Sequence, residues 1–121
     1  MKILEDLSLS NLNQAQFEPM MVSEDTSVGE ISWIKFGRVQ FWRGTEETCP
    51  QTVPYPIARE ETVYVIEGSA DVEFEDGTVH RLNPGDLATF ELGAQTTWTF
   101  TFPFTKVAMF ADSTSPRKAT S

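Results

Sequence analysis

Residues 61–86 read ETVYVIEGSADVEFEDGTVHRLNPGD, a stretch in which short strand-like runs alternate with turn signals. Residues 62–66 are nearly all apolar or β-branched, which predicts a strand that is covered on both faces and ends at Gly68. Apolar and acidic side chains then alternate through residues 70–74, as in a strand with one buried face. The stretch is therefore typical of a β-sheet domain.

Two turn signals separate these runs. Asp76-Gly77 predicts a type I′ hairpin turn, in which both central residues need a positive φ. In the second turn, residues 83–86, Pro84 presets φ at the first central position and Gly85 supplies a positive φ at the next. The chain between and after these turns is expected to return as further strands.

More strands are predicted on both sides of this stretch, at residues 31–36, 39–42, 87–90, 97–102 and 106–111. The turn-prone residues 45–56 contain three prolines and read as a loop or an edge, because proline cannot donate to a strand ladder. Roughly nine short strands without helical crossovers predict an all-β sandwich or barrel.

The two ends of the chain are less regular. Residues 1–28 carry leucines at mixed spacing, which fits a short strand, a frayed helix or an arm that packs on a partner subunit. We treat them as an N-terminal arm, residues 29–111 as the barrel, and the polar residues 112–121 as a disordered tail.

The composition excludes several function classes. The 121 residues include 18 acidic and 9 basic side chains, for a formal net charge of -9. Nucleic acids and anionic membranes both attract clustered Lys and Arg, so we exclude both as partners. The single cysteine, Cys49, cannot form an internal disulfide, and the sequence lacks a signal-peptide pattern and a membrane-spanning apolar run. We therefore expect a cytoplasmic protein.

Two segments resemble the paired sequence motifs of the cupin superfamily. In the first, Glu61 is followed after six residues by Gly68; in the second, the NPGD turn of residues 83–86 is followed by a strand and Gly93. The resemblance covers about residues 40–111 and implies a double-stranded β-helix, the jelly-roll barrel of RmlC-like cupins.

A narrower resemblance concerns Thr97-Trp98 and Lys106. These residues are similar to those of the small single-domain cupins grouped with ureidoglycine aminohydrolase and the ethanolamine-utilisation cupins. That likeness implies a homodimer and an activity in ureide or amine metabolism.

The resemblance also implies where a metal would lie. Metal-dependent cupins hold one divalent ion with a His-x-His pair, a Glu and a later His, and the corresponding residues here are Tyr55, Ile57, Glu61 and Thr96. Only Glu61 is a credible ligand, whereas a transition metal needs about three protein ligands. We therefore predict no resident metal or other cofactor, with a divalent metal at Glu61 as the alternative.

The barrel interior is the predicted pocket. Glu61 is either a general base or a structural carboxylate that pairs with Lys106 or an arginine. Lys106 either anchors a ligand, pairs with Glu61 or lies exposed on its strand. Tyr55, Tyr64 and Trp98 either stack on a flat ligand or fill the core. The full set of predicted pocket residues is Tyr55, Ile57, Tyr64, Thr96, Trp98 and Lys106.

Two reactive residues are not assigned to the pocket. His80, the only histidine, follows the hairpin turn and is predicted to face solvent. Cys49 lies in the proline-containing loop with no histidine near it in sequence, so we interpret it as a buried or loop residue rather than a nucleophile.

Three functions fit these observations. The first is a metal-free cupin that binds a small polar organic molecule inside the barrel. The second is a metal-dependent or metal-independent enzyme of ureide or amine metabolism that uses Glu61. The third is a non-catalytic, dimeric structural or regulatory module.

Overall fold

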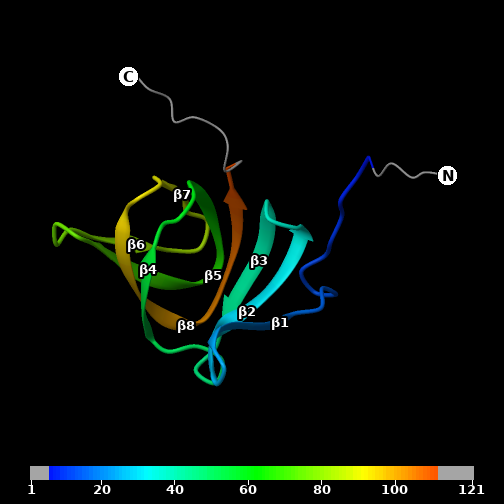
Figure 1. Cartoon of the computed structure of the whole chain (residues 1–121), viewed down its shortest axis with the longest axis horizontal. Coiled ribbons are helices and arrows are strands. Elements are labelled where there is room, and N and C mark those ends of the chain that lie inside the picture. The colour runs from blue at the N-terminus through cyan, green and yellow to red at the C-terminus, as the bar shows by residue number, and fades with distance from the viewer. Residues whose placement is uncertain (1–5, 112–121) are drawn as a thin grey trace.

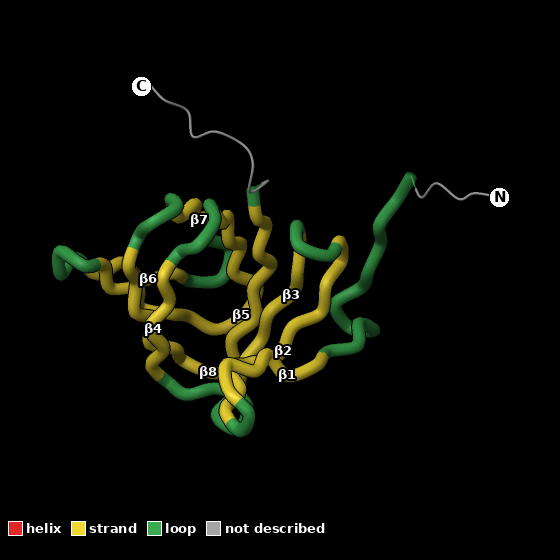
Figure 2. The backbone as a smooth tube through the Cα atoms, viewed as in Figure 1, coloured by secondary structure: helices red, strands yellow, loops and turns green. Residues whose placement is uncertain are grey.

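The computed structural model describes residues 6–111, and all of the regular structure in that range is β-strand (Figures 1 and 2). The strands are β1 (Glu18–Ser23), β2 (Thr26–Lys35), β3 (Val39–Gly44), β4 (Thr52–Pro56), β5 (Glu61–Phe74), β6 (Val79–Leu82), β7 (Leu87–Phe90) and β8 (Gln95–Phe110). The all-β prediction is confirmed. No helix within these residues has the length and apolar character needed to cross a membrane.

The strand pairings define two layers that share β5 and β8. One layer contains β1, β2, β3, the end of β8, the start of β5 and β7, and the other contains β4, the start of β8, the end of β5 and β6. All of these pairs are antiparallel. Figure 1 shows β4 and β6 on one side of the barrel and β1 to β3 on the other, with β5 and β8 passing between them.

Each of the two shared strands bends where it passes from one layer to the other. The β5–β8 ladder is irregular on both sides of Glu67, and Gly68 follows with a φ of 77°. A Cβ on Gly68 would lie 2.1 Å from the backbone oxygen of Pro103, so this position requires glycine. β5 continues through its bend, so the predicted runs 62–66 and 70–74 form one strand rather than two.

Burial alternates along the first half of β5. Glu61, Val63 and Val65 are buried, whereas Tyr64 is 43% exposed. Since side chains on a strand alternate between faces, only one face of this segment is covered. The prediction of a strand covered on both faces is therefore wrong.

The core between the layers is rich in aromatic rings. Phe100 lies at its centre, with ring centroids 5.0 Å from Phe104, 5.3 Å from Trp42 and 5.9 Å from Trp98. All four of these side chains are buried. Packing of this kind fills most of the space between the two layers around Phe100.

The hairpin between β5 and β6 differs from the predicted type I′ turn. The amide of Gly77 donates to Phe74 O at 2.8 Å, and the amide of Phe74 donates to Thr78 O at 2.8 Å. These bonds enclose a three-residue loop, and Gly77 takes a positive φ while Asp76 does not. Asp76 instead accepts hydrogen bonds from the amide and hydroxyl of Thr78. The turn at residues 83–86 has the predicted positive φ at Gly85.

The N-terminal segment continues the sheet. β1 and the first residues of β2 lie within residues 1–28, and β1 pairs with β2 while β2 pairs with β3. Of the alternatives left open for residues 1–28, a short strand is present, and periodicity could not single it out because β1 is an edge strand whose side chains are mostly exposed. The predicted disordered tail, residues 112–121, lies outside the described residues.

Candidate functional site

Glu61 is the buried acceptor at the centre of the site. It is the first residue of β5 and is only 1% exposed. Its Oε1 accepts a hydrogen bond of 2.5 Å from the Tyr55 hydroxyl on β4, and its Oε2 lies 3.2 Å from Nζ of Lys106 on β8. Side chains from two other strands thus converge on the single carboxylate that β5 supplies.

Lys106 is held in a cage of aromatic rings. Its Nζ lies 4.8 Å from the ring centroid of Trp98, 5.4 Å from that of Trp42 and 5.5 Å from that of Tyr55. Aromatic faces attract cations, so the cage and Glu61 together stabilise a buried ammonium group. Lys106 is 6% exposed, which rules out its interpretation as an exposed strand lysine and shows the predicted pairing with Glu61.

A short chain of hydrogen bonds fixes Tyr55 and Trp98, two of the three aromatic residues around Lys106. The Trp98 indole nitrogen donates to Thr96 Oγ1 at 3.0 Å, and that hydroxyl donates to the backbone oxygen of Tyr55 at 2.6 Å. Burial, the negative charge of Glu61 and the hydrogen bond to it together raise the pKa of the Tyr55 hydroxyl. Tyr55 is therefore a donor to Glu61 at neutral pH rather than a second anion.

Gln40 is a buried polar residue that the sequence analysis missed. It points inward from β3, is 6% exposed and lies two positions before Trp42 on the same face of the strand. Its carboxamide makes no hydrogen bond with the part of the chain that the structure describes. The signal was present in the sequence, since residues 39–42 place a polar side chain between apolar ones.

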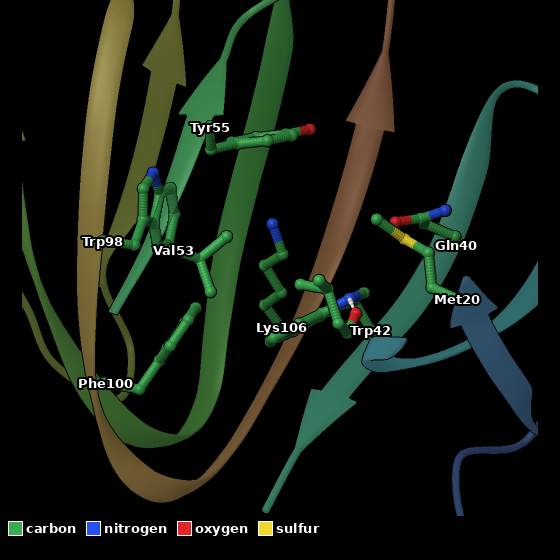
Figure 3. A pocket seen from close by; sticks show the side chains of 9 residues that line it. Met20, Gln40, Trp42, Val53, Tyr55, Trp98, Phe100 and Lys106 are labelled. Atoms are coloured by element: carbon green, nitrogen blue, oxygen red, sulfur yellow. Dashed lines mark hydrogen bonds between the residues drawn. The ribbon is translucent and has the colours of Figure 1, made fainter. Parts of the chain in front are cut away.

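The interior cavity lies between Lys106 and Gln40 (Figure 3). Its volume is about 40 Å³, and Figure 3 shows the Lys106 side chain pointing into the space between Tyr55 and Val53 on one side and Gln40 and Met20 on the other. The lining residues are Met20, Val28, Gln40, Trp42, Val53, Tyr55, Trp98, Phe100 and Lys106.

The predicted pocket residues fall into three groups. Tyr55, Trp98 and Lys106 line the interior cavity. Ile57 and Thr96 are buried but do not line it, and Thr96 acts through its hydrogen bonds. The prediction for Tyr64 is wrong, because alternation along β5 directs this side chain to the outer face.

The residues at the predicted metal position do not suit a cation. Tyr55, Ile57 and Thr96 stand where His ligands would, and both oxygens of Glu61 are engaged, one of them by the ammonium of Lys106. The Lys106 ammonium already lies against the Glu61 carboxylate, so a second cation would be repelled. Within residues 6–111 no group of three or more His, Cys, Asp or Glu side chains could hold a metal ion.

The histidine and the cysteine lie away from this site. His80 is exposed and its ring lies edge-on to Phe74, with centroids 5.8 Å apart. Cys49 is a buried thiol between β3 and β4, and burial raises its pKa to about 11. A thiol with a raised pKa is a weak nucleophile at neutral pH.

Comparison with known families identifies the class of protein. Residues 40–108 match the family model described as the EutQ-like cupin domain. The match covers more than half of the 121 residues and contains β4 to β7 together with most of β3 and β8. The chain therefore belongs to this family of cupin domains.

Solved structures agree with that assignment. A DUF861 family protein from Thermotoga maritima is 27% identical, with a TM-score of 0.53, over 59% of this chain and 76% of that one. An RmlC-like cupin from Shewanella frigidimarina is 16% identical, with a TM-score of 0.60, over 84% and 86% of the two chains. The polyketide cyclase RemF from Streptomyces resistomycificus is 15% identical, with a TM-score of 0.64, over 90% and 82%. The last two support the fold alone. A search of curated proteins found no match to the sequence.

Proposed function

We propose that the barrel binds a small polar organic molecule in the interior cavity without a metal. One observation carries this proposal: two buried polar groups face the same cavity with unused hydrogen-bonding capacity. The Lys106 ammonium has three N–H donors and gives one to Glu61, while the Gln40 carboxamide has no partner within residues 6–111. Buried polar groups are normally satisfied, so a molecule that fills the cavity is expected to complete them.

The cavity restricts the ligand to a few atoms. A volume of 40 Å³ holds about three water-sized groups, since one water needs roughly 10–15 Å³ on this measure. A flat ring stacked between Tyr55 and Trp98 does not fit, because these rings already meet edge to face with centroids 6.2 Å apart. The ligand, or the part of it that enters the barrel, is therefore small.

The test is a thermal-shift screen of small polar molecules against the parent protein and a Gln40→Leu variant. A ligand of the interior cavity raises the melting temperature of the parent more than that of the variant, because it binds the folded state. Gln95→Leu is the matched control, since Gln95 is exposed at the start of β8. Stabilisation that is equal in all three proteins would place binding elsewhere.

Metal analysis is the second arm of this test. The protein, purified without a histidine tag and incubated with Mn, Ni, Zn and Fe, is expected to retain less than stoichiometric metal in elemental mass spectrometry. One equivalent of a transition metal after dialysis would overturn the metal-free part of the proposal.

An enzyme of ureide or amine metabolism, similar to ureidoglycine aminohydrolase, is the second candidate. It is favoured by the buried carboxylate itself, since Glu61 is one hydrogen bond away from the cavity-lining Lys106. In this function the Lys106 ammonium would give a proton to Glu61, and the resulting neutral amine would take a proton from the substrate. The test measures release of ammonia from ureides by the parent and by two variants. Activity that Glu61→Gln abolishes and Gln95→Leu preserves would favour this enzyme over the metal-free binding protein.

We also propose a cytoplasmic homodimer that uses the outer face of the layer formed by β7, β5 and β8. Tyr64 pairs in register with both Leu87 and Val107, so the three side chains form a row, and Tyr64 and Leu87 are exposed. A second copy would cover this row. Light scattering is expected to give a dimer for the parent and a monomer for Tyr64→Lys; an unchanged mass would count against this face.

A further inference from the structure

We propose that the ligand of the interior cavity is an uncharged carboxamide, and this inference rests on the function proposed above. The relevant observation is the charge balance of the site. Among residues 6–111, Lys106 is the only charged residue that lines the interior cavity, and Glu61 neutralises it at 3.2 Å. The wall of the binding site is therefore mostly apolar, and the few polar groups on it carry no net charge.

Both kinds of charged ligand are disfavoured by this balance. An anion would lie near Glu61 as well as Lys106, and a cation would lie near Lys106 inside an aromatic cage that already holds one positive charge. Charges interact strongly in a buried site, where water cannot screen them. A neutral molecule adds polar contacts without adding a second uncompensated charge.

The unused hydrogen-bonding groups match a carboxamide. The ammonium of Lys106 can donate to the carbonyl oxygen of the ligand, because lysine carries donors only. The side chain of Gln40 both donates and accepts, so its oxygen can receive an N–H of the ligand. An aldehyde has no donor for Gln40, and an alcohol would have to serve both partners from a single oxygen.

The rest of the wall fits a short alkyl group. Apart from Gln40, Tyr55 and Lys106, the lining side chains are Met20, Val28, Trp42, Val53, Trp98 and Phe100. Met20 lies on the edge strand β1 and is partly buried, so its flexible side chain can adapt to a ligand with one more carbon. A primary amide of two carbons comes nearest to the volume of this cavity, and its methyl group suits the mostly apolar wall.

The experiment uses three molecules of nearly the same shape: acetamide, acetate and acetamidinium. Binding to the full chain at pH 7 is followed through the indole N–H signals of Trp42 and Trp98, which line the interior cavity, with Trp33 as an internal reference outside it. We expect acetamide to bind at least about tenfold more tightly than either ion. Acetate that binds as tightly as acetamide would overturn the inference and leave the proposed function standing.

Glu61→Gln separates charge from shape. The amide keeps the size of the side chain and leaves the Lys106 ammonium unbalanced, so the preference is expected to reverse in favour of acetate. Gln40→Leu is expected to weaken acetamide binding at least about tenfold, whereas Gln95→Leu leaves it unchanged.

Should Glu61→Gln not fold, binding of the three molecules to the parent and to the Gln40→Leu variant still decides the inference. If none of the three molecules shifts either indole signal, both the inference and the proposed function fail for ligands of this size.

Discussion

The Nζ of Lys106 lies 3.2 Å from Oε2 of Glu61, and both side chains are almost completely buried in the barrel. The two residues are 45 positions apart in the sequence and meet because β5 and β8 pair along most of their length. The ion pair occupies the place where the cupin resemblance implies a metal. The positive charge beside the Glu61 carboxylate is therefore the Lys106 ammonium rather than a metal ion.

Removing one partner of this pair is expected to destabilise the fold strongly. Lys106→Met should lower the free energy of unfolding by about 3–5 kcal/mol, because it leaves the Glu61 carboxylate buried without its counter-charge. Adding Glu61→Gln to this variant should restore the free energy of unfolding to within about 1–2 kcal/mol of the parent, since both charges are then gone. Urea denaturation of the parent, the two single variants and the double variant gives the coupling energy.

The control is an exposed ion pair of the same barrel. Arg81 and Asp71 lie 3.6 Å apart, with side chains that are about half exposed. Arg81→Met should therefore change the free energy of unfolding by less than about 1 kcal/mol. A Lys106→Met variant no less stable than Arg81→Met would show that the buried pair contributes little.

The Cys49 thiol predicts a loss of stability in alkali. Burial raises its pKa from the ordinary value of 9.0 to about 11, so the unfolded chain releases this proton at a lower pH than the folded one. The folded state binds more protons between these values, and stability falls as the pH rises from 9 to 11. Burial also raises the pKa of Tyr55, which acts in the same direction at higher pH.

Chemical denaturation between pH 8 and 11 measures this slope in the parent and in Cys49→Ala. The variant should lose the part of the slope that belongs to the thiol and keep the part that belongs to Tyr55. The native thiol should also react slowly with an aromatic disulfide at pH 8 and rapidly in denaturant. Rapid labelling of the folded protein would contradict the burial of Cys49.

The sequence predicted the barrel and part of the site for physical reasons that differ between residues. Glycine and proline mark turns directly, which is why residues 61–86 predicted strands and a barrel. Glu61 and Lys106 were found through the resemblance to cupin motifs, and their pairing was one of the alternatives that the sequence left open. Tyr64 was assigned to the wrong face because residues 62–66 are nearly all apolar or β-branched, and Thr62 alone is too weak a signal to mark the exposed side.

Other features of the site depend on packing in three dimensions. Gln40 is a single polar residue in a short run, and only the structure shows that it reaches the same cavity as Lys106. The small volume of the interior cavity follows from the sizes and rotamers of the aromatic side chains that fill the barrel. Neither property can be read from the spacing of residues along the chain.

Gly68 is predicted to be the least replaceable glycine of the barrel. It has a positive φ, and a Cβ would lie 2.1 Å from Pro103 O, which is backbone and cannot rotate away. Gly68→Ala should therefore cost more than about 3 kcal/mol, through both strain and the clash. Gly93→Ala is the matched control, because it has the same sign of φ and no atom within 4 Å of the new Cβ.

The control variant should lose only about 1–2 kcal/mol, the cost of a left-handed conformation for alanine. Thermal unfolding of the two variants measures the difference, which isolates the close approach of β5 to β8 at the bend. Equal losses would mean that the chain relieves the clash by shifting the backbone near Pro103.

Thr96 is predicted to stabilise the site through its hydroxyl group rather than through contact with a ligand. That hydroxyl accepts from the Trp98 indole nitrogen at 3.0 Å and donates to Tyr55 O at 2.6 Å. Thr96→Val keeps the shape and leaves a buried donor without a partner, so it should cost about 1–3 kcal/mol. Thr99→Val is the control, because Thr99 bonds to the hydroxyl of Thr52 on the exposed face and its loss should cost less than about 0.5 kcal/mol.

The Trp98 indole N–H signal should move in Thr96→Val and stay in place in Thr99→Val, since only the first substitution removes its acceptor. A Trp98 signal that is unchanged in both variants would show that the indole finds its acceptor elsewhere.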